Sequence, residues 1–251
     1  LGGLASTFAR WESAESLTIY AGAYALERVR DLMAVVLRGG DIKLKVHFEA
    51  LAPGPLLTAG DLDVVAFPVK HRGGGSFGFL FQERSRRPFL VPEAEALGVP
   101  PGPERRELVQ GRSITLADGR VIAPDDVLGP REQGTKLVVV GDTARVTDLV
   151  TVARRADLLV CESTYLAEDV ESARRFSHIT AREAAELAKA ADVGGLVLTH
   201  VSRRYATRNI VKEARSVFPN SFVAEDFDHY EVMRGEVRRG ALDTARRPRG
   251  E

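Results

Sequence analysis

Three short apolar runs in the second half of the chain each end in polar side chains, and this pattern restricts the fold more than any other feature. The polar residues that follow the runs are Asp142, Glu162 and His200. Open α/β sheets place their sites outside the carboxyl ends of their strands. We therefore expect an α/β fold with a site at the carboxyl end of a sheet. The apolar runs occupy residues 137–140, 157–161 and 195–198, and helical patterns over 181–191 and 209–217 accompany them.

The first half of the chain mixes helical spacing with short strand-like runs. Residues 1–8 and 24–37 have helical character, the second with apolar side chains at i, i+3 and i+4. The strand-like runs look like a meander. One of them closes with Pro68 and delivers His71 to a glycine-rich loop. These runs occupy residues 16–20, 42–49, 60–68 and 77–83.

Proline marks a change of character between residues 84 and 134. Seven of the twelve prolines of the chain fall in this range. Pro100-Pro101-Gly102-Pro103 is incompatible with a helix or a central strand, because proline lacks the backbone donor. Asp118-Gly119 between alternating apolar residues predicts a hairpin over 113–122. We interpret the segment as an insertion outside the core.

The chain is thereby divided into four segments. Residues 1–83 form one αβ part, 84–134 the insertion, and 135–233 a second βα part. The remaining tail, 234–251, contains six arginines, few apolar residues and no periodicity. A segment of this composition cannot bury enough apolar surface to order itself, so we expect it to be disordered.

Charge and composition exclude several classes of protein. Lysine plus arginine number 35, as do aspartate plus glutamate, so a nucleic-acid site must be a local patch such as Arg84, Arg86 and Arg87. The single cysteine, Cys161, excludes an internal disulfide framework and favours a reducing compartment. The sequence has no apolar run of about 20 residues and no signal-peptide pattern in residues 1–8. We expect a cytoplasmic protein without a membrane segment.

Four side chains have the chemistry of a metal-dependent hydrolase: His71, Asp142, His178 and His200. Imidazole and carboxylate ligands suit zinc or manganese, and a carboxylate can bridge two cations. Asp142 is a candidate bridge, although capping of a strand-to-helix turn explains it equally well from local sequence. A buried core histidine is as good an interpretation of His200 as a ligand, and loop surface is an alternative for His71.

Together with their neighbours, these residues resemble the ribonuclease Z family, tRNA 3′-end-processing endonucleases with the metallo-β-lactamase fold. The Pro-Pro-Gly-Pro element distinguishes the ribonuclease Z family from general metallo-β-lactamases, which do not share it. The resemblance implies an α/β fold, the αββα sandwich, incomplete at its amino terminus and carrying an exosite-like insertion. The matching segments cover nearly the whole chain: 67–71 with 76–79, 97–103, 115–121, 141–143, 162–165, 177–180, 198–200, 218–220 and 224–227.

The resemblance also implies a role for each candidate site residue. His71 is similar to a ligand of the first of two zinc ions, Asp142 to the bridging carboxylate, and His200 to a ligand of the second. Glu162 and His178 match the proton-shuttling pair of the family, in which the glutamate orients the imidazole that protonates the leaving oxygen.

Substrate and partners follow from the same resemblance. The 224–227 loop, with Asp226, matches a segment linked to placing the tRNA end, and Gly102 and Pro103 belong to the arm that grips the tRNA. Arg204, just beyond His200, is a candidate phosphate contact, although a solvated helix start is an equally good interpretation. Precursor tRNA is the implied substrate, and a homodimer the implied assembly.

The sequence departs from the family pattern in three places. The His-x-His-x-Asp-His signature, which supplies most metal ligands, is absent, and three candidate ligands cannot complete two sites. The first residue, Leu1, is not an initiator methionine, so we expect that the chain begins just after that signature. Cys161 stands where many members have histidine, and Arg72-Gly73-Gly74-Gly75 replaces bulkier loop residues.

Two other functions are compatible with these residues. A different metallo-β-lactamase-fold phosphodiesterase or hydrolase, acting on a small substrate, would share the metal residues without needing the insertion. A non-catalytic RNA-binding or scaffold protein would naturally lack the metal signature. Deleting residues from about Arg84 to Arg112 separates the first alternative from ribonuclease Z, and the codons upstream of Leu1 separate the second.

Overall fold

The structure, a computed structural model, describes residues 1–38, 43–72, 75–233 and 235–240. The chain divides into two compact units. The main unit comprises Leu1–Gln82 and Thr135–Glu251, and the insert unit comprises Glu83–Gly134. Within the described ranges, no helix combines the length and the apolar character needed to cross a membrane.

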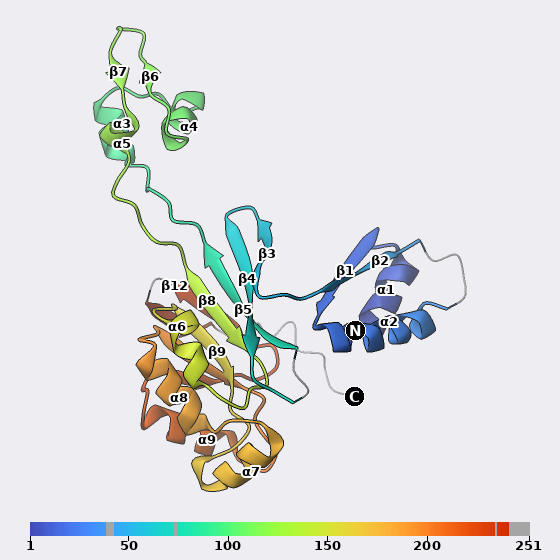
Figure 1. The fold of residues 1–251 in the computed structure, drawn as a ribbon. Coiled ribbons are helices and arrows are strands. Elements are labelled where there is room, and N and C mark those ends of the chain that lie inside the picture. Colours follow the sequence, from blue (N-terminus) through green and yellow to red (C-terminus); the bar gives the residue numbers. More distant parts are fainter. Residues whose placement is uncertain (39–42, 73–74, 234, 241–251) are drawn as a thin grey trace. The chain divides into compact units, whose positions relative to one another are not determined.

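A mixed seven-stranded sheet is the largest element of the main unit (Figure 1). Its order is β11-β10-β9-β8-β5-β4-β3. The four strands from β8 to β11 are parallel, whereas β5 pairs antiparallel with β8, and β3 antiparallel with β4. The strands are β3 (Gly54–Ala59), β4 (Leu62–Val69), β5 (Ser76–Glu83), β8 (Lys136–Val140), β9 (Leu158–Glu162), β10 (Gly195–Thr199) and β11 (Ser221–Val223).

Strand β10 is apolar along its length because both faces of the sheet are covered there. Leu196 and Leu198 lie in the larger core cluster with the helices, whereas Val197 lies in a second cluster with Leu158 and Val237. Successive side chains of a strand point to opposite faces, so one run supplies both cores. This is the continuous apolar pattern of a parallel strand buried on two sides.

Helices α6 (Val150–Ala153), α7 (Val170–Phe176), α8 (Ala181–Ala190) and α9 (Thr207–Arg215) connect the parallel strands. A capping box starts α8: the Thr180 hydroxyl accepts the Glu183 amide N–H at 3.2 Å, and the Glu183 carboxylate accepts the Thr180 N–H at 2.9 Å. Two orphan donors of the first turn are thereby satisfied. Four buried alanines of α8 belong to the larger core cluster.

A smaller βαβ element precedes the sheet in the chain. Its members are α1 (Gly2–Trp11), β1 (Ser16–Ala21), α2 (Ala23–Val36) and β2 (Lys45–Ala50). Strands β1 and β2 are parallel, and parallel neighbours require a crossover such as α2. Ala5, Ile19 and Met33 form the buried centre of this element.

The insert unit has a small core of its own. Helices α3 (Val91–Ala96), α4 (Pro103–Val109) and α5 (Pro124–Val127) surround it, and strands β6 (Ile114–Thr115) and β7 (Val121–Ile122) form the hairpin expected at Asp118-Gly119. The prediction that Pro103 is excluded from a helix is wrong, because it stands at the first position of α4. The missing N–H of proline has no partner to lose there. The buried core residues are Ala94, Val99, Leu108, Ile122, Val127 and Leu128.

The Arg87 side chain contacts other residues of the insert unit. Its guanidinium donates to the carbonyl oxygens of Gly129 at 2.8 Å and Leu128 at 2.7 Å, and it pairs with Asp125. These contacts hold the two ends of the insert sequence together. The Arg87 guanidinium therefore stabilises the insert unit, and its place in an RNA-binding patch stays a prediction.

The carboxyl-terminal tail is partly structured. Strand β13 (Glu236–Arg239) pairs antiparallel with β12 (Tyr230–Met233). The prediction of disorder from residue 234 is thus wrong for 236–239, because Val237 is buried against Leu158 and Val197. The single apolar side chain of Val237 is enough to order this strand, because the neighbouring sheet supplies the apolar surface against which it packs. Residues 234 and 241–251, on which the rest of that prediction falls, lie outside the described residues.

A leucine-to-alanine substitution tests the core of the insert unit. Leu108 is fully buried in α4, whereas its neighbour Val109 is exposed. Leu108→Ala should destabilise the insert unit by about 2–5 kcal/mol, because it leaves a cavity, and Val109→Ala should change stability by less than about 0.5 kcal/mol. Hydrogen exchange of residues 83–134 measures both. Equal effects of the two variants would contradict this core assignment.

Candidate functional site

Four polar side chains of the main unit converge beyond the ends of the strands. His71 follows β4, Asp142 follows β8, and His200 follows β10. His178 comes from the segment between α7 and α8, one residue after Ser177, which ends α7 in the left-handed conformation with φ 60°. Residues far apart in the chain therefore meet at one end of the sheet.

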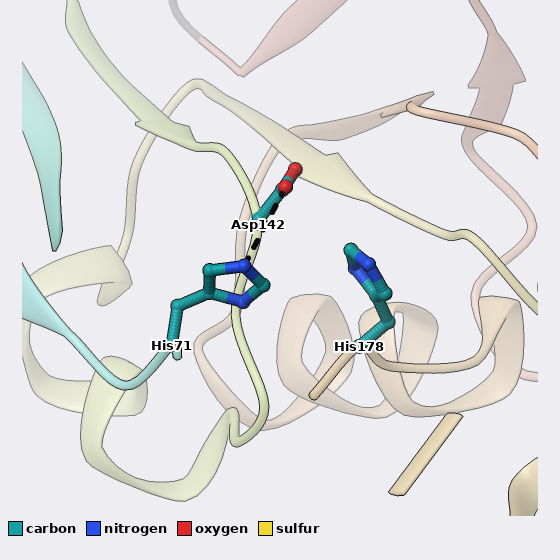
Figure 2. A group of neighbouring side chains, drawn as sticks. All are labelled: His71, Asp142 and His178. Atoms are coloured by element: carbon teal, nitrogen blue, oxygen red, sulfur yellow. Dashed lines mark ion pairs between the residues drawn. The ribbon is translucent and has the colours of Figure 1, made fainter. Parts of the chain in front are cut away.

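The carboxylate of Asp142 lies between two imidazoles. Its Oδ2 is 3.8 Å from Nε2 of His71, and its Oδ1 is 3.5 Å from Nε2 of His200. Figure 2 shows the His71 contact as a dashed line. Each oxygen of the carboxylate thus faces a different histidine. This is the arrangement that a bridging carboxylate between two cations requires.

His71 is oriented by a hydrogen bond through its other nitrogen. Nδ1 of His71 is 2.9 Å from the carbonyl oxygen of Ser177. Because a carbonyl only accepts, Nδ1 carries the proton in this contact and Nε2 keeps its lone pair. Fixing the tautomer in this way is what the outer contacts of a metal-binding histidine do. The free lone pair faces Asp142.

Glu162 is a fully buried carboxylate with 0% side-chain exposure. It accepts hydrogen bonds from the Thr143 amide at 2.6 Å, the Thr164 hydroxyl at 2.6 Å and the Ile179 amide at 3.4 Å. Nδ1 of His178 lies 3.0 and 3.1 Å from its two oxygens. A buried charge is tolerated only when it is paired and hydrogen-bonded, and these donors meet that condition.

His178 also lies within reach of the metal-type donors. Ligand atoms of His71, Asp142 and His178 all lie within 4.8 Å of one another, and Figure 2 shows these side chains around one space. The His178 ring centroid is 5.3 Å from that of His71 and 5.1 Å from that of His200. A carboxylate contact such as that with Glu162 is found for metal-binding histidines and for acid–base histidines. The distances around His178 therefore do not decide between these two roles.

The donor set fits zinc in kind. Imidazole nitrogen and carboxylate oxygen are established zinc ligands, and catalytic zinc sites use three protein ligands. His71 and His200 with the two oxygens of Asp142 offer one nitrogen and one oxygen to each of two adjacent positions. Among the described residues, these donors would supply part of the coordination of two ions.

Cys161 adds no ligand to this set. Its side chain is fully buried in the larger core cluster. Burial, with a smaller contribution from the Glu162 carboxylate, raises the pKa of the Cys161 thiol far above its ordinary value. The thiolate is the form that binds metal. Cys161 is therefore a packing residue where the family pattern has histidine.

The predicted substrate-binding residues fall in three places. Arg204 is exposed, 3.6 Å from Asp169 and 6.0 Å from the centre of the Tyr165 ring, which in turn is 6.3 Å from the His178 ring. Asp226 is exposed in the loop after β11. Gly102 and Pro103 belong to the insert unit, at the start of α4. Among these predicted residues, Arg204 is connected to His178 through the Tyr165 ring.

Sequence reasoning missed the residues that support this site. Thr143, Thr164, Tyr165 and Ser177 lie inside the segments that matched the family, yet nothing in the local pattern assigned them a contact. Their position immediately beside Asp142, Glu162 and His178 was the available signal. Such neighbours are well placed to orient functional side chains.

Comparisons with known proteins identify the family and the fold of the chain. No family model matches the chain. The chain is 46% identical to the ribonuclease Z of Bradyrhizobium diazoefficiens over 230 residues, which are 92% of this chain and 76% of that protein.

Two solved structures show the same fold. The metallo-β-lactamase fold protein YhfI from Bacillus subtilis has a TM-score of 0.57 and 20% identity, covering 95% of this chain and 71% of YhfI. The short form of human tRNase Z has a TM-score of 0.54 and 21% identity, covering 90% of this chain and 71% of that protein. The predicted metallo-β-lactamase fold is confirmed. The 46% identity along most of the chain shows in addition that it belongs to the ribonuclease Z family.

Proposed function

We propose that the chain functions as a zinc-dependent endoribonuclease, which removes the 3′ trailer from precursor tRNA and leaves a 3′-hydroxyl on the tRNA. The observation that carries the proposal is the Asp142 carboxylate between His71 and His200, next to the buried Glu162–His178 pair. The similarity to ribonuclease Z of Bradyrhizobium diazoefficiens supports this choice of reaction. The similarity identifies the family, and the site supplies candidate residues for the chemistry.

In this proposal His71, Asp142 and His200 hold two zinc ions. Zinc, when bound, lowers the pKa of water and offsets the negative charge that develops on the phosphodiester. Asp142 has both oxygens directed at the histidines that would share it. His71 presents Nε2 because its Nδ1 proton is engaged by Ser177. We expect weak zinc binding by the described residues alone, because His71, Asp142 and His200 give each position fewer than three donors.

We assign His178 to proton transfer instead of metal binding. The two oxygens of Asp142 are already directed at His71 and His200, whereas His178 has a buried carboxylate partner of its own. Glu162 holds the proton on Nδ1 and stabilises the charged imidazolium. Nε2 of His178 then donates a proton to the leaving 3′-oxygen of the tRNA while the phosphate stays on the trailer, as a general acid works best with a pKa near the working pH.

Substrate binding in this proposal uses separate parts of the chain. Arg204 contacts a phosphate near the scissile bond, and Asp226 helps to position the tRNA end. The insert unit, with Gly102 and Pro103, grips the folded RNA at a distance from the cut. Folded RNA is read mainly by shape and backbone contacts, which suits a chain of zero net charge. A homodimer in the cytoplasm is part of the same proposal.

Alanine variants divide the metal ligands from the acid. His200→Ala should lose bound zinc, because it removes the partner of Asp142 Oδ1. His178→Ala should keep zinc and reduce turnover by about 10²–10⁴-fold, the usual contribution of general acid–base catalysis. Zinc is measured by elemental analysis after equilibrium dialysis. Equal zinc loss in both variants would contradict this division.

Glu162→Gln tests the support of His178. Both carboxylate oxygens accept hydrogen bonds, so an amide group must oppose one donor whichever way it turns. We expect a loss of about 1–3 kcal/mol in the free energy of unfolding together with lower turnover at unchanged zinc content. Glu168→Gln, at an exposed position of the same connection, is the control for urea denaturation. An unaltered Glu162→Gln protein would refute the role.

Removing the insert unit separates RNA cleavage from small-substrate hydrolysis. Gln82 pairs with Lys136 across β5 and β8, so an Asn-Gly linker in place of 83–134 leaves a short hairpin loop. With zinc supplied in excess, this variant should hydrolyse bis(p-nitrophenyl) phosphate like the parent protein and cleave precursor tRNA at least tenfold more slowly. Retained tRNA cleavage would count against the insert as an RNA arm. A parent protein that hydrolyses only the small ester would contradict the proposed function.

A further inference from the structure

The loop after β11 begins beside the strand that ends in His200. The Ala224 amide donates to the Leu198 carbonyl at 2.9 Å, which continues the pairing of Leu198 with Val223. Glu225, Asp226 and Phe227 then extend outward and are exposed. The base of the loop therefore lies beside Leu198, two residues before His200, and the loop contributes none of the candidate metal donors named above.

The loop contains a tight turn with an unfavourable residue in it. The Asp228 amide donates to the Glu225 carbonyl at 3.1 Å, so Asp226 and Phe227 occupy the middle of the turn. Phe227 has φ 71° and is 56% exposed. Left-handed backbone is rare for a bulky side chain, and such strain persists only where the surroundings over-determine it. Burial of the Phe227 ring does not provide that support.

Asp228 provides a second, buried tie for this turn. Its side chain is only 2% exposed. One oxygen accepts the Glu225 amide at 2.9 Å and the Tyr230 hydroxyl at 3.2 Å, and the other accepts Nη2 of Arg239 at 2.6 Å. The carboxylate thus closes the turn from inside and connects it to a residue eleven positions later.

Arg239 is held in turn by the main sheet. It lies on β13 directly opposite Tyr230 on β12, and Val237 on the same strand is buried against Leu158 of β9 and Val197 of β10. Burial acts to raise the pKa of Asp228, but the Glu225 amide and the Arg239 guanidinium outweigh it and hold the pKa below its ordinary value. The hydrogen bond to Asp228 raises the pKa of Arg239. Both groups are therefore stabilised in their charged forms.

We propose that Asp228 and Arg239 form a latch that holds the 225–228 turn in place for the unpaired 3′ region of the RNA, so that Arg239 is a positioning residue. The proposal rests on the proposed function for the identity of the ligand. Carboxylates repel phosphates, so the exposed Asp226 favours contacts with base amino groups and ribose hydroxyls, whereas the Glu225 carboxylate pairs with Arg239 at 3.7 Å. The exposed Phe227 ring offers a face on which an unpaired base stacks. A turn that has lost the latch keeps these groups but no longer presents them together.

Two adjacent arginines give a matched test. In the part of the chain that the structure describes, Arg238 forms an exposed ion pair with Glu236 on the same strand, so Arg238→Ala is the control for Arg239→Ala. We expect Arg239→Ala to speed hydrogen exchange of the amides of Glu225 and Asp228 by on the order of tenfold, the usual effect of losing a hydrogen bond to a charged group. The KM for precursor tRNA should rise several-fold while kcat changes by less than twofold. Arg239→Lys should restore most of the parent behaviour.

The readouts keep this proposal separate from the proposed function. Equal exchange in Arg239→Ala and Arg238→Ala overturns the latch, whatever the activity. A fall in kcat without a change in KM overturns the positioning role, and so does a failure of Arg239→Lys to restore KM. Faster exchange in Arg239→Ala alone supports the latch even in a parent protein that does not cleave tRNA, a result that would contradict only the proposed function.

Discussion

The buried carboxylate of Glu162 is the interaction on which the site depends. It receives the Thr143 amide, which follows Asp142 at the end of β8, and the His178 imidazole, which precedes α8. The Glu162 charge has no access to water. It connects β9 to the segment that carries Asp142 and to the segment that carries His178. Its removal from water is tolerable only because every donor is in place. The relative position of Asp142 and His178 follows from that requirement.

The sequence could predict where polar side chains leave the sheet, because strand periodicity and strand ends are local properties. Asp142, Glu162 and His200 were found in this way, and the family resemblance added the expected grouping with His71 and His178. Local pattern could not reveal that Nδ1 of His71 meets the carbonyl of Ser177, 106 residues away. Contacts of this kind depend on tertiary packing, and any residue type offers the same backbone carbonyl.

The wrong prediction for the tail and the absence of a prediction for strands β3 and β11 have related causes. The tail from 234 was judged by its arginines and its few apolar residues, yet Val237 finds an existing apolar surface on β9 and β10, and Arg239 finds Asp228. Composition measures what a segment can bury by itself, and β13 does not fold by itself. Strands β3 and β11 escaped prediction because Gly54–Ala59 contains Pro55, and Ser221–Val223 is only three residues long. Pairing with longer neighbours defines both strands.

Burial divides the acidic residues around the site into two kinds. Glu162 and Asp228 have 0% and 2% side-chain exposure, and each accepts hydrogen bonds from backbone N–H, from a hydroxyl and from one basic side chain. Their oxygens are directed at these internal donors, so the two residues fix the backbone around them. Asp142 is 42% exposed with each oxygen directed at a different imidazole, and Asp226 is exposed at the tip of its turn. In both places a buried acid orients the segment that presents an accessible one, which keeps the accessible carboxylate available without leaving its backbone loose.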